Sequence, residues 1–155
     1  MPLGPVPFTL QTLVLAMLPI ALGGRDAVIT VAVWMAAGAI GLPVFSGFSG
    51  GIGHVLGPTG GFIWGFLVGT MCSAAVLRLD AIPEHVREGL AAGAMLLVSY
   101  ALGTLQLVAL LGIDPAAALG MAVLPFVVPD VLKLAAGIVA GRAVKRALSV
   151  GARTV

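Results

Sequence analysis

Charged residues are scarce in this sequence. They make up 9% of the 155 residues, against roughly a quarter in ordinary soluble domains. Hydrophobic residues make up 60%, and the mean hydropathy is +1.17. Stretches without any charge cover residues 1–24, 27–77 and 89–113, and a transmembrane helix needs about 20 mainly apolar residues. This composition excludes a soluble enzyme and predicts an integral membrane protein.

Residue types that bind metals or catalyse reactions are also scarce. Cys72 is the single cysteine, which excludes an internal disulfide and a cysteine-cluster metal site. His54 and His85 are too few and too far apart for a histidine metal site, and the sequence has no GKS or GKT phosphate-binding motif. We therefore expect no catalytic residue, no metal, no cofactor and no use of ATP by this chain itself.

The apolar stretches predict an all-α helical bundle that forms a single transmembrane domain over residues 1–155. The expected spans are residues 8–22, 26–40, 59–78, 87–111 and 129–148. Asp114 and Pro115 form a good N-cap and N1 pair, which predicts a short helix before the last span.

Residues 41–61 contain eight glycines, two prolines and no charge. The segment is too interrupted for a helix and too apolar for a solvated loop. Backbone of this kind is tolerated at membrane depth only where it is buried in protein or lines a cavity, because lipid cannot hydrogen-bond its amides and carbonyls. The segment is therefore predicted to form part of a binding site or pore.

Basic residues predict the orientation, because cytoplasmic loops carry an excess of lysine and arginine. Seven of the eight fall on one side of the expected spans: Arg25, Arg78, Arg87, Arg142, Lys145, Arg146 and Arg153. The opposite side, with residues 41–58 and 112–128, has none. We therefore expect a cytoplasmic C-terminus, an outward glycine-rich loop and no nucleic-acid binding. Five spans place the N-terminus outside, so we also expect one further helix before Met1 in the complete protein.

Small residues recur at spacings that predict close helix packing. Glycine or serine stands at every fourth position from Gly57 to Ser73, which makes one small helix face. The pairs at 89 and 93 and at 137 and 141 repeat the pattern. We expect another helix to approach each of these faces.

Lys133 is the one basic residue within an expected span and away from the cytoplasmic group, and Asp130 precedes it by three residues. The two share a helix face, and ionisable residues inside a membrane indicate function by default. The alternative is a salt bridge that only braces the helix. If Pro129 is the first helical residue, Asp130 lies in the first turn, where the helix dipole favours a carboxylate. Tyr100 lies midway along an apolar helix and is predicted to contact either a ligand or an internal hydrogen-bond partner.

Several motifs together resemble the BioY family. They are GPVPFTLQTL at 4–13, GAIGLPVFSGFSGG at 38–51, GPTGGF at 57–62, YALG at 100–103 and LPFVVPDVLK at 124–133. Members of this family are biotin-specific substrate-binding (S) components of energy-coupling factor transporters. The resemblance implies a six-helix bundle in the bacterial plasma membrane, whose first helix would precede the motif at 4–13. It also implies biotin binding on the outer side, and partnership with one transmembrane coupling subunit and two ATPases.

The resemblance also implies a set of substrate-binding residues. Asp130 and Lys133 would contact biotin, and residues 41–53 would line and cap the pocket. The full expected set is Asp130, Lys133, Tyr100, Gly41, Phe45, Gly47, Gly50, Gly53 and Thr59.

Two other functions remain open from the sequence. One is an S component or small carrier for a different vitamin. The other is an intramembrane enzyme that uses Asp130 and Lys133 as an acid and base pair, although the chain offers it no nucleophile, metal ligands or second acid. Purification distinguishes the three functions. Retained biotin supports the biotin S component, another retained vitamin supports the second function, and turnover of a substrate supports the enzyme.

Overall fold

The structure is a computed structural model that describes residues 9–151, with side chains up to residue 149. The described residues form seven helices and one isolated β-bridge between Phe45 and Ser49. The helices are α1 (Gln11–Leu22), α2 (Gly24–Ala39), α3 (Ile52–Leu56), α4 (Gly60–Val76), α5 (Glu84–Leu111), α6 (Pro115–Ala122) and α7 (Leu124–Gly151). The first residue of the first expected span, residue 8, and the basic residue Arg153 lie outside the described residues.

The expected spans correspond to α1, α2, α4, α5 and α7, and the prediction for the last helix needs correction. Helix α7 begins at Leu124, so Pro129 lies inside it and Asp130 is not in its first turn. The helix-dipole argument for Asp130 is therefore wrong. The short helix α6 is confirmed, because the Asp114 carboxylate accepts hydrogen bonds from the backbone N–H groups of Ala116 and Ala117, at 2.9 and 3.2 Å.

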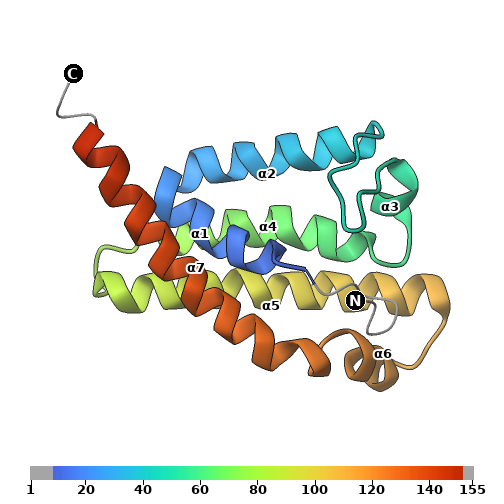
Figure 1. The fold of residues 1–155 in the computed structure, drawn as a ribbon. Coiled ribbons are helices and arrows are strands. Elements are labelled where there is room, and N and C mark those ends of the chain that lie inside the picture. Colours follow the sequence, from blue (N-terminus) through green and yellow to red (C-terminus); the bar gives the residue numbers. More distant parts are fainter. Residues whose placement is uncertain (1–8, 152–155) are drawn as a thin grey trace.

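Figure 1 shows how the helices are arranged. Helices α4 and α5 lie side by side, α2 packs on α4, and α7 crosses the bundle obliquely and packs on α1. The glycine-rich connection between α2 and α4 lies at one end of the bundle, and the N-terminal ends of α2 and α5 lie at the other. Because α7 runs obliquely, its first half lies near α6 and its second half near the opposite end.

Close contacts confirm the predicted small face of α4. A Cβ atom added at Gly65 would lie 2.5 Å from the Cα of Ser99, and one at Gly69 would lie 2.7 Å from the carbonyl oxygen of Met95. Both neighbours belong to α5, so these two helices approach closely only because the side chains are absent. The prediction for Gly89 and Gly93 is wrong, because no heavy atom of the described residues lies within 4 Å of an added Cβ at either position.

Within residues 9–151, two helices are long and apolar enough to cross a membrane: α5, and residues Leu124–Ser149 of α7. Helices α1 and α4 are apolar but shorter, at 12 and 17 residues. Large apolar side chains are exposed along the bundle, including Leu97, Leu105 and Leu132 at 69%, 64% and 67%. This surface suits lipid rather than water. The fold is therefore a helical bundle of a membrane protein, and the number of spans stays a prediction.

Candidate functional site

The Asp130 carboxylate is the centre of a buried polar cluster that joins three helices. Its Oδ1 accepts hydrogen bonds from the Thr12 hydroxyl of α1 at 3.0 Å and from the Lys133 amine of α7 at 2.8 Å. Its Oδ2 accepts a hydrogen bond from the Tyr100 hydroxyl of α5 at 2.7 Å. Asp130 is 4% exposed and Lys133 is 8% exposed. The structure therefore brings Asp130, Lys133 and Tyr100 together. The sequence predicted the shared helix face of Asp130 and Lys133, whereas it left the partner of Tyr100 open.

Glycines on α7 explain how this cluster assembles. A Cβ at Gly137 would lie 2.4 Å from the carbonyl oxygen of Leu13, and one at Gly141 would lie 2.9 Å from that of Met17. The predicted small face at 137 and 141 is thus confirmed, and its partner is α1. This close approach places Thr12 within hydrogen-bond distance of Asp130, which sequence spacing alone does not indicate.

Tyr100 makes the internal hydrogen bond, one of the two roles left open by the sequence. A carboxylate has about four acceptor positions. Two donors occupy Oδ1 and one occupies Oδ2, so Asp130 retains one acceptor position, next to the Tyr100 hydroxyl. The pair of Asp130 and Lys133 is a salt bridge, but a buried ion pair is weak proof of a stabilising role, because desolvation offsets much of the attraction. By this count of acceptor positions, Oδ2 could accept one further hydrogen bond.

Thr104 is a candidate site residue that the sequence reasoning missed. It lies on α5 one turn beyond Tyr100, so the two share a helix face. Its hydroxyl oxygen is buried, and no hydrogen-bond partner for it is found in the described part of the chain. Buried hydroxyls normally have a partner. The signal in the sequence was a polar residue four positions after Tyr100, on the same helix face.

The glycine-rich segment folds back on α2 as a tight loop. Gly41, Gly47 and Gly51 have φ of 109°, 74° and 107°, a region that favours glycine. The segment also contains the short helix α3, so the prediction that it is too interrupted for any helix is wrong. Phe45 is 6% exposed. Its ring packs against Gly38 of α2, where an added Cβ would lie 2.1 Å from the Cζ of Phe45.

Side chains of α2 and α5 donate hydrogen bonds to backbone carbonyls of the glycine-rich loop. The Gln106 amide donates to the carbonyl of Gly57 at 2.6 Å, and the Trp34 indole N–H donates to the carbonyl of Val44 at 3.0 Å. Non-helical backbone in apolar surroundings needs such partners, because lipid cannot hydrogen-bond its carbonyl groups.

Trp34 connects this loop to the core that contains Tyr100. Its ring lies 5.2 Å from that of Phe45 and 6.3 Å from that of Phe66, measured between centroids. Phe66 belongs to the main hydrophobic core, on which Tyr100 also packs. The sequence left open whether Trp34 faces lipid or the interior, and it packs inside. Phe45 is thereby linked to the core around the Asp130 cluster.

The other expected binding residues are not part of the Asp130 cluster. Gly41, Gly47 and Gly53 have open space at the Cβ position, and a Cβ at Gly50 would lie 2.3 Å from the carbonyl oxygen of Leu42. Thr59 is the N-cap residue of α4 without a side-chain capping bond. Their contribution to a binding site stays a prediction. No group of three histidine, cysteine or acidic side chains suited to a metal ion is found among the described residues.

Comparison with solved structures identifies the class of fold. The crystal structure at 2.1 Å of the S-component for biotin from an ECF-type ABC transporter matches with a TM-score of 0.82 and 25% sequence identity. The match covers 92% of this chain and 77% of that chain. The fold is therefore that of an S component.

Sequence relatives narrow the class to a family. The probable biotin transporter BioY of Pyrococcus horikoshii is 37% identical over 88% of this chain and 79% of the relative. The biotin transporter BioY of Thermotoga maritima is 36% identical over 86% and 77%, and BioY2 of Lactococcus lactis is 35% identical over 96% and 81%. The family model described as the BioY family matches residues 1–150. The chain belongs to the BioY family.

Proposed function

We propose that this protein captures biotin and delivers it across the membrane, as the substrate-binding S component of a vitamin transporter. The observation that carries the proposal is the buried Asp130 carboxylate, which collects donors from three helices beside the Lys133 amine. Intramembrane charges are costly and mark substrate pathways. Membership of the BioY family and the names of its relatives support biotin over another vitamin.

The chemistry of biotin suits these side chains. The ureido ring carries two N–H donors, and one of them can occupy the remaining acceptor position on Asp130 Oδ2. The valerate carboxylate requires a cation, and Lys133 supplies three N–H donors in total. Thr104 adds a hydroxyl that lacks an internal partner. Charge-assisted bonds of this kind contribute about 1.5–3 kcal/mol each, so the loss of one weakens binding roughly 10- to 150-fold.

The proposal includes the orientation and the partners. We place the protein in a bacterial plasma membrane, with the glycine-rich loop outward and the C-terminus in the cytoplasm, because the basic side chains gather at the end of the bundle opposite that loop. The chain is assigned no catalysis of its own. A transmembrane coupling subunit and two ATPase subunits would supply the energy for transport.

Biotin methyl ester tests the role of Lys133. The ester lacks the carboxylate, so wild-type protein should bind it more weakly than biotin, while Lys133→Met should hardly distinguish the two. Asp130→Asn should weaken both ligands roughly equally. Lys145→Met is the matched control, because it removes a lysine from an exposed ion pair with Glu84, and it should behave as wild type.

The assay is competition against labelled biotin on purified protein whose folding is checked by its melting temperature. Wild-type affinity of both site variants for biotin would show that the pair of Asp130 and Lys133 only braces α7. Displacement of biotin by a different vitamin at lower concentration would instead assign the site to that vitamin.

A further inference from the structure

A cavity lies at the basic end of the bundle, and no residue of the Asp130 cluster lines it. Its volume is about 400 Å³. It lies between the end of α1, the start of α2, the end of α4, the start of α5 and the second half of α7. Among the described residues, four basic side chains line it, namely Arg25, Arg78, Arg87 and Lys145, together with the acidic residues Glu84 and Glu88.

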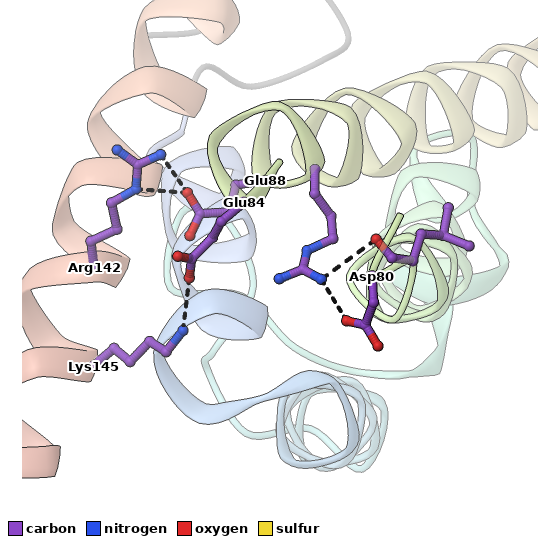
Figure 2. A network of polar contacts seen from close by, with 7 residues as sticks. Asp80, Glu84, Glu88, Arg142 and Lys145 are labelled. Carbon is purple, nitrogen blue, oxygen red and sulfur yellow. Dashed lines mark hydrogen bonds and ion pairs between the residues drawn. The ribbon is translucent and has the colours of Figure 1, made fainter. Parts of the chain in front are cut away.

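The acidic side chains of this cavity already have cationic partners. Figure 2 shows Glu84 and Glu88 side by side, with Lys145 and Arg142 reaching them from α7. The Lys145 amine lies 3.1 Å from Glu84 Oε1, and Arg142 Nε donates to Glu88 Oε2 at 2.6 Å. Glu88 is 2% exposed. Each carboxylate is therefore already paired with a cation of α7, and basic side chains outnumber acidic ones on the cavity lining that the structure describes.

The arginines of the cavity retain unused donors. Arg87 Nη1 pairs with Asp80 at 2.9 Å, but its Nε is buried and has no hydrogen-bond partner within the described residues. Arg25 and Arg78 form no ion pair with any described residue. Three guanidinium groups thus border one cavity with donors to spare. Guanidinium groups bind phosphate through paired N–H donors.

The remaining wall of the cavity is apolar. It consists of the last turn of α1, from Pro19 to Leu22, and of Leu77 at the end of α4. A free phosphate ion gains nothing from such a wall, whereas a phospholipid presents a phosphate directly beside hydrocarbon. Basic pockets between transmembrane helices are a known setting for anionic headgroups.

We propose that this cavity binds the phosphate group of an anionic phospholipid, with Arg25, Arg78 and Arg87 as donors and the end of α1 against the acyl chains. The site is separate from the biotin site, and its occupancy does not depend on biotin.

Native mass spectrometry of the purified full chain tests this proposal. Delipidated protein is mixed with equimolar phosphatidylglycerol and phosphatidylcholine, and the two adducts are compared. Wild type should retain phosphatidylglycerol preferentially. Arg25→Gln and Arg78→Gln should each reduce that adduct on the order of fivefold, since one basic residue near a lipid surface contributes about that factor. Arg146→Gln is the matched control, because Arg146 lines a neighbouring cavity instead.

Three results would overturn the proposal. One is equal retention of the two lipids by wild type. Another is a loss of phosphatidylglycerol in Arg146→Gln as large as in the cavity variants, which would indicate a diffuse surface charge effect. The third is full displacement of phosphatidylglycerol by millimolar inorganic phosphate, which would assign the cavity to the free ion. Melting temperatures confirm that each variant is folded.

Discussion

Replacing Gly65 by alanine tests the contact between α4 and α5, which positions Tyr100. The added Cβ would lie 2.5 Å from Ser99 Cα, 3.1 Å from its carbonyl oxygen and 3.3 Å from its carbonyl carbon. All three are backbone atoms, so rotation of a side chain cannot relieve the contact. The two helices must instead move apart. Overpacking of this kind costs about 1–3 kcal/mol, while alanine gains about 1 kcal/mol over glycine in helix propensity.

Gly93→Ala separates the two effects, because Gly93 lies in α5 and no heavy atom in the described part of the chain is within 4 Å of an added Cβ there. This variant should gain only the helix propensity of alanine, about 1 kcal/mol. The free energy of unfolding of Gly65→Ala should therefore lie about 1–3 kcal/mol below that of Gly93→Ala. Thermal unfolding in one detergent, followed by static light scattering and tryptophan fluorescence, provides the comparison. If Gly65→Ala is as stable as Gly93→Ala, the close approach of α4 and α5 is not a constraint on the fold.

Three further predictions concern orientation, capping and the missed hydroxyl. In a Cys72→Ser background, an impermeant thiol reagent should label a cysteine at Ser46 in intact cells but not one at Ser149; the reverse pattern would invert the topology. Asp114→Ala should lower the free energy of unfolding by about 1 kcal/mol through loss of the α6 cap, and an unchanged melting temperature would contradict that role. Thr104→Val should weaken biotin binding about 2- to 13-fold. The protein without biotin should be equally or more stable, because the variant removes a buried hydroxyl that has no partner among the described residues. Lower stability with unchanged affinity for biotin would point to a structural role for Thr104.

Local patterns predicted most of the helices, and the failures have physical causes. The start of α7 was placed at Pro129 because proline favours the first turn. Proline in a helix interior removes one hydrogen bond and crowds the carbonyl of residue i−4, yet membrane helices tolerate it because neighbouring groups satisfy the freed backbone. Glycine spacing identified the faces at 65 and 69 and at 137 and 141 correctly, but Gly89 and Gly93 have the same spacing and no neighbour. Glycine spacing indicates where a second helix can pack closely. Whether a second helix lies there depends on the topology of the bundle.

The candidate site was predictable to the same degree. Asp130, Lys133 and Tyr100 were identifiable because polar groups in apolar helices are costly and need partners. Thr12 and Trp34 join the site region through contacts between segments far apart in sequence, which no local pattern encodes. The role of the loop glycines depends on the position of a bound ligand, and for that reason their assignment rests on the resemblance.

Calorimetric titration of the purified, biotin-free chain with biotin, without any ATPase subunit, tests the central claim most directly. The account predicts saturable binding of one biotin per chain, and a 10- to 150-fold weaker affinity in Asp130→Asn. Folded wild-type protein that releases no binding heat at any temperature tested, and fails to retain labelled biotin in equilibrium dialysis, would contradict the claim.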